Sequence, residues 1–381
     1  MPHGLDSPDR SSTPWRHGVR ERVSIQATRV RFPTRGLLVV AVLVLAASAI
    51  VSGDLRGPHG SSPEGLSLAG HTQLIEAVTF SPDGRTLASA GWDHTVRLWN
   101  RAAWSPGMEA EPVVLPHDSA RFAMAFSPDG SLLVTTGDGS MTIWARGTGY
   151  RRLVEKTGRS YRCATFSPDS RTLVLGANDG TVRFWDMPSA QERMVLTGHT
   201  DMLRSVTFSP DGKLLASSGQ DGRVLLWDAT SGVVLRTVAG PRSDSIPNVA
   251  FAPDGSTLAL SEFAWEPRDV LLLDVATGAV RSRLSGHQRG INALTFAPDG
   301  RTLATAGADR CIKLWDLATG QERATLRDHV GWVKSIVFSP DSAWLAYSGR
   351  DATVRLWDLE RPRSQSAGPL SSRTRPGDAR S

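Results

Sequence analysis

Short apolar runs alternate with turn residues along most of the chain, and residues 198–239 show this pattern clearly. Within them, 205–208, 213–217, 223–227 and 233–238 are mainly apolar or alternate between apolar and polar. Such runs are typical of β-strands. Ser209-Pro210-Asp211-Gly212 separates the first two runs, because proline presets a turn and glycine permits the backbone that follows it. The pattern therefore predicts four strands joined by tight turns.

This four-strand unit recurs seven times. A turn phrase, Phe-Ser/Ala-Pro-Asp, returns every 40–46 residues, and a closing phrase, Trp-Asp or a relative, keeps the same period. Four antiparallel strands per period form one blade of a β-propeller. The sequence therefore predicts an all-β fold, a seven-bladed β-propeller over residues 65–358. The turn phrases begin at Phe80, Phe126, Phe166, Phe208, Phe251, Phe296 and Phe338, and the closing phrases at Trp99, Trp144, Trp185, Trp227, Leu273, Trp315 and Trp357.

The two ends of this repeat array predict how the ring closes. After Trp357-Asp358 no apolar strand remains to complete the seventh blade. Residues 65–69 stand before Gly70-His71 just as residues 193–196 stand before Gly198-His199. We therefore expect 65–69 to form the outer strand of blade seven, which removes an exposed sheet edge. The polar tail 359–381 is expected to be disordered.

The segment before the propeller contains an uncharged apolar run, residues 36–52. As a helix it would span about 25 Å, close to the thickness of a bilayer core. Arginines are concentrated before this run, which places the N-terminus in the cytoplasm by the positive-inside rule. The prediction is a single transmembrane anchor, with a basic disordered segment 1–35, a linker 53–64 and an external propeller. A signal sequence cleaved near Ala49, which would give a secreted protein, and a buried element are alternatives.

The formal net charge of +5 resides in the two ends of the chain. Seven arginines and three acids give residues 1–35 a charge of +4, and five arginines and two acids give 359–381 a charge of +3. Residues 36–358 therefore carry −2, and we expect no nucleic acid among the partners. Only four of the 43 basic residues are lysines, a bias that indicates a GC-rich, bacterial genome.

The sequence predicts no enzyme, no cofactor and no metal site. Cys163 and Cys311 lie in different repeats and are expected to be small buried residues. The Asp-Gly pairs lie in repeated turns and lack the spacing of a calcium loop. No His and Cys group has metal-ligand spacing, and no glycine-rich phosphate loop is present.

The repeats resemble the WD-repeat (WD40) family over roughly residues 65–358. Gly70-His71, Gly198-His199 and Gly286-His287 open repeats, and closing pairs such as Trp227-Asp228 end them, as the family pattern requires. The resemblance implies a structural His, Ser/Thr, Asp and Trp tetrad in each regular blade. Because the same four residue types recur in three repeats, they favour a structural role over a hydrolase catalytic triad. The implied tetrads are His71, Ser89, Asp93 and Trp99; His199, Ser217, Asp221 and Trp227; and His287, Thr305, Asp309 and Trp315.

Other repeats depart from this pattern. The second has Pro116-His117 and the third Gly158-Arg159 at the opening position, while the seventh has Asp328-His329 and carries Tyr347 where Ser or Thr is expected. The fifth departs most, with Gly240-Pro241, an insertion at 262–267 and Leu273 in place of Trp. We therefore expect blade five to be the least regular.

The predicted function is a non-catalytic scaffold, displayed on a membrane, that binds other proteins; we expect a monomeric propeller. The repeat-opening loops and the loops between second and third strands share one face and vary between blades. Trp and Arg are frequent in binding hot spots. The alternative is that the rings of Trp92 and Trp332 only cover the backbone of their loops. An enzyme or small-ligand sensor using the central channel and a structural role in an envelope complex are alternatives. The candidate partner-binding residues are Leu74, Glu76, Trp92, Arg162, Met202, Arg204, Trp332, Lys334 and Arg350.

Overall fold

The computed structural model describes residues 66–104, 111–117, 119–147, 149–239, 246–263, 269–327 and 331–360. Within these ranges no helix is long and apolar enough to cross a membrane. The predicted basic segment 1–35, anchor 36–52 and linker 53–64 lie outside the described residues. The same holds for residues 361–381 of the predicted tail, for Asp328-His329 and for Gly240-Pro241.

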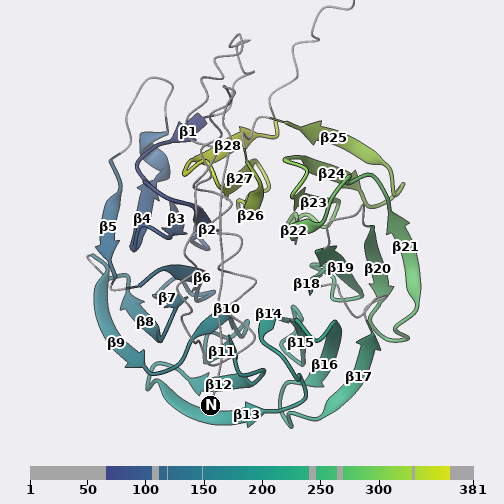
Figure 1. Ribbon diagram of the computed structural model, residues 1–381, viewed down its shortest axis with the longest axis horizontal. Coiled ribbons are helices and arrows are strands. Elements are labelled where there is room, and N and C mark those ends of the chain that lie inside the picture. Colours follow the sequence, from purple (N-terminus) through teal and green to yellow (C-terminus); the bar gives the residue numbers. More distant parts are fainter. Residues whose placement is uncertain are drawn as a thin grey trace, which may run out of the picture. The chain divides into compact units, whose positions relative to one another are not determined.

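The described strands form seven four-stranded antiparallel sheets, which confirms the predicted seven-bladed β-propeller (Figure 1). The first strand of each blade lies innermost, and the chain then steps outward through the second, third and fourth strands. Contacts between innermost strands run from β2 through β6, β10, β14, β18, β22 and β26 and return to β2. The ring is therefore closed around one axis.

The strands are short and of nearly equal length, as the repeated turn phrases predict. One 3-10 helix, η1 (Arg101–Ala103), follows β4 within the described residues. Blades one to three comprise β2 (Ile75–Phe80), β3 (Thr86–Gly91), β4 (Thr95–Asn100), β5 (Val113–Pro116); β6 (Arg121–Phe126), β7 (Leu132–Gly137), β8 (Ser140–Ala145), β9 (Arg151–Thr157); β10 (Tyr161–Phe166), β11 (Thr172–Ala177), β12 (Val182–Asp186) and β13 (Gln191–Leu196).

Blades four to seven repeat this arrangement, and the strands of blade four begin and end within two residues of the boundaries that the sequence pattern predicted. They comprise β14 (Leu203–Phe208), β15 (Leu214–Gly219), β16 (Arg223–Asp228), β17 (Val234–Ala239); β18 (Ile246–Phe251), β19 (Thr257–Phe263), β20 (Val270–Asp274), β21 (Val280–Leu284); β22 (Ile291–Phe296), β23 (Thr302–Gly307), β24 (Ile312–Asp316), β25 (Glu322–Leu326); and β26 (Val333–Phe338), β27 (Trp344–Gly349) and β28 (Val354–Asp358).

Blade seven takes its outer strand from the beginning of the described chain. Strand β1 (Leu66–Leu68) pairs antiparallel with β28, with Leu66 opposite Leu356 and Leu68 opposite Val354. The sheet order β1-β28-β27-β26 confirms the predicted closure. Because the two strands are far apart in sequence, this pairing holds the ring shut, and it covers the outer edge of β28.

The hydrophobic core lies between neighbouring blades. Phe184 of blade three packs with Phe208, Leu225 and Trp227 of blade four, and Trp227 is 1% exposed. Equivalent clusters recur around the ring because the turn-phrase Phe and the closing Trp recur. Fully burying one such side chain stabilises the fold by about 1.5–3 kcal/mol. The repeated apolar pattern therefore sets both the blades and their stacking.

Blade five keeps the strand order β18-β19-β20-β21 but differs in detail. Leu260 and Leu273, each 2% exposed, occupy the places that Ser217 and Trp227 take in blade four. Of its predicted insertion 262–267, residues 264–267 lie outside the described residues. Apolar side chains thus complete the same four-stranded sheet without the polar tetrad.

Candidate interaction face

Backbone hydrogen bonds define two faces of the propeller. Trp92 N–H donates to the Leu74 carbonyl at 2.9 Å, so the loop between the second and third strands contacts the segment before the first strand. Met202 and Trp332 carbonyls accept equivalent bonds, from Gln220 at 2.9 Å and Arg350 at 3.2 Å. We call this side the variable face, because its loop residues change from blade to blade.

The opposite side, called the uniform face here, carries the turn phrases. The Ser209 hydroxyl donates to Asp211 at 2.6 Å, and the Lys213 N–H donates to the same carboxylate at 3.1 Å. Gly212 follows with a φ of 72°, a left-handed conformation that favours glycine. The Ala229 N–H donates to the Lys213 carbonyl at 2.9 Å, which joins the blade-closing turn to the same face. The same Ser to Asp bond recurs in blades one, two, three and seven.

The three implied tetrads form chains of hydrogen bonds inside blades one, four and six. In blade one the Trp99 indole N–H donates to Ser89 Oγ at 2.9 Å, and Ser89 Oγ lies 2.7 Å from His71 Nε2. His71 Nδ1 lies 2.8 Å from Asp93 Oδ2. Since the Trp donates, the Ser hydroxyl donates onward to Nε2, and the Nδ1–H donates to the carboxylate. Every polar group in the chain then has a partner.

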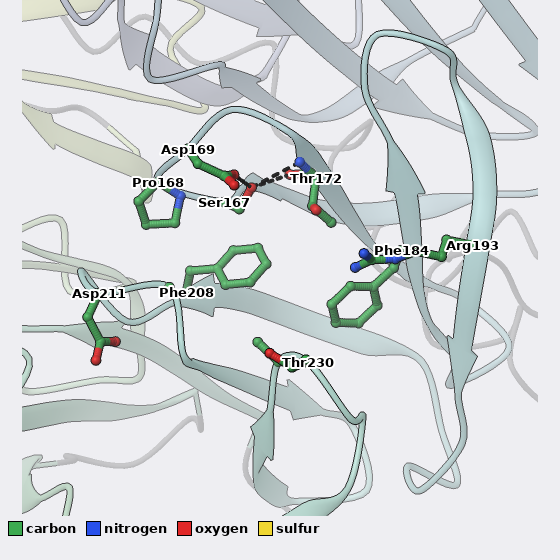
Figure 2. Close-up of a pocket in the computed structure, with 11 residues that line it drawn as sticks. Ser167, Pro168, Asp169, Thr172, Phe184, Arg193, Phe208, Asp211 and Thr230 are labelled. Atoms are coloured by element: carbon green, nitrogen blue, oxygen red, sulfur yellow. Dashed lines mark hydrogen bonds between the residues drawn. The ribbon is translucent and has the colours of Figure 1, made fainter.

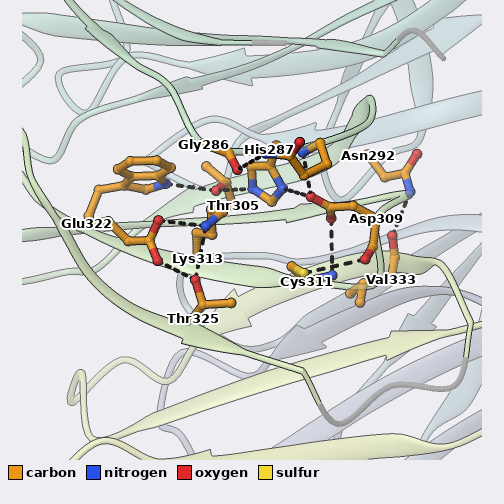
Figure 3. A network of polar contacts seen from close by, with 12 residues as sticks. Gly286, His287, Asn292, Thr305, Asp309, Cys311, Lys313, Glu322, Thr325 and Val333 are labelled. Atoms are coloured by element: carbon orange, nitrogen blue, oxygen red, sulfur yellow. Dashed lines mark hydrogen bonds and ion pairs between the residues drawn. The ribbon is translucent and has the colours of Figure 1, made fainter. Parts of the chain in front are cut away.

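Blade six repeats this chain with Thr in place of Ser (Figure 3). The Trp315 indole N–H donates to Thr305 Oγ1 at 2.8 Å, Thr305 Oγ1 lies 2.8 Å from His287 Nε2, and His287 Nδ1 lies 2.9 Å from Asp309. In blade four the Trp227 to Ser217 and Ser217 to His199 distances are 2.7 and 2.8 Å. The tetrads connect the repeat-opening loop to the second and third strands, and their repetition indicates architecture.

The environment of blade one keeps His71 neutral and Asp93 charged. Burial lowers the pKa of His71, although the Asp93 carboxylate opposes this effect. Burial alone would raise the pKa of Asp93, but hydrogen bonds from Thr95, His71 and the Thr72 N–H hold it below its ordinary value. The neutral His71 imidazole, hydrogen-bonded to the Ser89 hydroxyl and the Asp93 carboxylate, thus links the repeat-opening loop to the second strand of the blade and to the loop after it.

The first strand of most blades contains a bulge near its second residue. In six of the described blades the register with the neighbouring strand shifts at this point, whereas β18 of blade five pairs without a shift. A bulge leaves one residue out of the ladder and redirects its side chain. The residue lies four positions before the turn-phrase Phe, at the variable-face end of the innermost strand. The six residues are Glu76, Phe122, Arg162, Arg204, Asn292 and Lys334.

Blades one and seven bring several predicted partner-binding residues together across the seam. The Trp92 indole N–H donates to Glu76 Oε1 at 3.3 Å, and Lys334 Nζ lies 3.9 Å from Glu76 Oε2. The Arg350 guanidinium lies 5.1 Å from the centroid of the Trp332 ring. Glu76 and Lys334 side chains are only 17% and 18% exposed, so the ion pair is more strongly coupled than a surface pair.

Blades three and four supply the other predicted cations. Arg162 Nε donates to Asn178 Oδ1 at 3.1 Å, and its guanidinium lies 3.9 Å from the Phe122 ring centroid. Arg204 occupies the equivalent bulged position on β14. Burial lowers the pKa of Arg162; Asp138 and Glu76 oppose this, and Arg204 lowers it further. The positive groups are therefore close enough to repel each other.

The structure places all nine predicted partner-binding residues on the variable face. Leu74 and Met202 are half-buried in the loops, whereas the charged members extend from bulges or loop ends. The sequence did not point to three further contributors. The spacing of four residues before each turn-phrase Phe identifies two of them, and the third lies in a loop between second and third strands. These residues are Phe122, Asn292 and Asp138.

The uniform face contains a crevice of about 300 Å³ between blades three and four (Figure 2). Phe184 and Phe208 line it, and Ala229 contributes only a methyl group at the residue after Trp227-Asp228. A similar crevice of about 480 Å³ lies between blades five and six. Its lining residues occupy equivalent repeat positions, so these crevices follow from blade packing and do not single out one site.

The family comparison matches the WD domain, G-beta repeat, at residues 64–100, 112–145, 154–186, 190–228, 278–316 and 320–358, more than half of the chain. The chain belongs to the WD40 repeat family. No matched segment covers the three inner strands of blade five, β18, β19 and β20, so six repeats are found by family resemblance and the structure adds a seventh to this WD40 propeller.

Parts of this WD40 protein are similar to several curated proteins. Pre-mRNA-processing factor 19 of Bos taurus is 27% identical over 146 residues, 37% of this chain and 28% of the relative. Small ribosomal subunit protein RACK1y of Oryza sativa subsp. japonica is 30% identical over 138 residues, 35% of this chain and 38% of the relative. Cell division cycle 20.1, cofactor of APC complex, of Arabidopsis thaliana is 30% identical over 159 residues, 40% of this chain and 34% of the relative. The matches thus span less than two thirds of each relative.

Proposed function

We propose that this WD40 protein is a non-catalytic protein-interaction scaffold whose partner binds the variable face where blades one and seven meet. The observation that carries this proposal is the linked set Trp92, Glu76 and Lys334, with Arg350 against Trp332 beside it. Two aromatic rings and an arginine within one rigid, hydrogen-bonded surface are the residue types that dominate binding hot spots. Rigidity reduces the entropy that binding would otherwise lose.

The names of two relatives support a scaffold role. One is called a small ribosomal subunit protein and another a cofactor of the APC complex, so both names describe a component of a larger assembly. The tetrads add support, because their His and Ser groups are buried in repeated structural chains. A closed ring with loops that vary on one face suits recognition by surface residues.

The direct test combines capture with a folding control. Native partners are cross-linked and co-purified with the full chain and with a Trp92→Ala, Trp332→Ala, Arg350→Glu variant. Removing two anchors and reversing one charge is expected to reduce capture at least about tenfold. A Lys213→Glu variant provides the control, because Lys213 is 81% exposed on the uniform face. Unchanged capture by a folded triple variant would place the partner elsewhere.

We further propose that residues 36–52 display the propeller on a membrane, with residues 1–35 in the cytoplasm of a bacterial cell. The uncharged apolar run and the arginines before it support this topology. Protease added to intact cells or spheroplasts is expected to digest the propeller. Protection that ends only on lysis would contradict an external propeller. Cleavage near Ala49, seen as a shortened mature N-terminus, would replace the anchor with secretion.

A further inference from the structure

Three of the six bulged positions carry cations around the propeller axis, namely Arg162, Arg204 and Lys334, while Glu76 carries the one negative charge. We define the axial cluster as Glu76, Arg162, Arg204, Lys334 and Arg350. Blades three and four contribute Arg162 and Arg204, while Lys334 and Arg350 come from blade seven, and β10, β14 and β26 all surround the axis in Figure 1. Cations from separate blades therefore converge at the variable-face end of the innermost strands.

Lys334 lies at the same bulged position of blade seven as Arg162 and Arg204 do in blades three and four. Burial lowers its pKa, Glu76 opposes this, and Arg204, Arg350 and Arg162 lower the pKa further. The direction of this shift agrees with the placement of the four cations around one axis. Together with Asp138, which acts on Arg162, the four cations face two carboxylates, an excess of 4 − 2 = +2. Such an excess at partly buried positions favours an anion as a further neighbour.

Three of the four cations contact neighbouring side chains that hold them in place. Arg162 is fixed between the Phe122 ring and Asn178, and Arg350 lies against Trp332. Lys334 is oriented by Glu76, which Trp92 in turn holds. Donors held in this way lose little freedom when they bind, and charge-assisted hydrogen bonds to carboxylate or phosphate are the strongest that these side chains form.

We propose that the axial cluster is an anion-binding subsite that receives an acidic side chain of the protein partner. The proposal rests on the scaffold function above and adds the chemistry of the partner: a segment rich in Asp or Glu, or one carrying a phosphorylated residue. A peptide fits better than a polyanionic nucleic acid or a lipid surface, because the excess charge is small and confined to the axis. The residues 36–358 carry −2 in total, which disfavours a broad anionic partner.

The test uses fluorescence polarisation with the purified full chain and labelled hexaglutamate, and with a phosphoserine peptide of otherwise neutral sequence. Arg204→Gln combined with Lys334→Gln is compared with Lys213→Gln combined with Arg301→Gln, which removes two exposed charges from the uniform face. We expect the axial variant to bind at least about tenfold more weakly, and the control to bind as the parent does. If the loss of Lys334 impairs folding, the single Arg204→Gln variant is used in its place, and its peptide binding is compared with that of the parent.

The outcomes separate this proposal from the scaffold function. Preference for one peptide identifies the source of the anion as carboxylate or phosphate. Equal weakening by axial and control variants, or no binding of either peptide, overturns the anion subsite. If both peptides fail to bind, phosphatidylserine vesicles and duplex DNA are tested in the same way. Binding of either one that is weakened by Arg204→Gln would also overturn the assignment of a peptide as the ligand. If native capture requires Trp92 and Trp332 but not Arg204, the scaffold stands and the axial subsite does not.

Discussion

Blade four and blade five build the same sheet from different chemistry. Both place four antiparallel strands in the same order, and both bury apolar residues against their neighbours. Blade four contains the His199 to Trp227 tetrad and a bulge at Arg204, whereas blade five substitutes Leu260 and Leu273 and pairs its first strand without a shift. The apolar pattern is therefore sufficient for a blade, while the bulge in blade four directs a charged side chain, Arg204, to the variable face.

The largest loss of stability is expected when apolar volume is removed from blade five. Leu260→Ala should destabilise the protein by about 2–5 kcal/mol, because the leucine is buried and leaves a cavity among rigid neighbours. Urea unfolding measures the change. Ser261→Ala is the control, since its buried hydroxyl has no hydrogen-bond partner among the described residues and its removal should cost almost nothing. Similar losses from both changes would show that blade five does not depend on its apolar pair.

A smaller effect is expected from the tetrad of blade four. Ser217→Ala removes the acceptor of the Trp227 N–H and the partner of His199 Nε2, both of which are buried. Leaving such groups unsatisfied should cost about 1–3 kcal/mol in unfolding free energy. Ser67→Ala, at an exposed position of the outer strand β1, should change stability by less than about 0.5 kcal/mol. A silent Ser217→Ala would mean that the tetrad adds no stability beyond apolar packing.

The smallest expected effect is a pH dependence in blade one. Because burial lowers the pKa of His71, the folded state resists the proton that the unfolded state accepts near its ordinary pKa of 6.5. Its contribution to stability is complete above that value and is lost as pH falls toward the lower folded pKa. Melting temperatures measured between about pH 7.5 and 5.5 should fall more for the parent than for His71→Gln. An equal fall in both proteins would show that other groups control the response.

The sequence predicted the fold because its signals are local and repeated. The turn phrase and the closing Trp predict each blade, and the lack of a fourth strand after Asp358 pointed to residues 65–69 as the closing strand, of which Leu66–Leu68 form β1. The tetrad residues also came from repeat position, through the family resemblance. Blade five departs from these motifs, yet its four-stranded sheet forms because Leu260 and Leu273 preserve the apolar positions.

The candidate site was only partly predictable. Sequence spacing placed Glu76, Arg162, Arg204 and Lys334 on one face, but it did not show that Glu76 pairs with Lys334 or that Arg162 lies against Phe122. These contacts join residues from different blades, and they depend on bulges that the alternating pattern does not reveal. Convergence around an axis is a property of the closed ring, so no single repeat contains it.

The central claim is that a protein partner binds the variable face near the axis, and site-specific photo-cross-linking tests it most directly. A benzoylphenylalanine is introduced at Met202 on the variable face or at Lys213 on the uniform face of the same blade, in the full chain within its native cells. If the partner binds the variable face, a discrete protein adduct is expected from position 202 and none from position 213. Adducts of equal yield from both positions, or an adduct from position 213 alone, would contradict it.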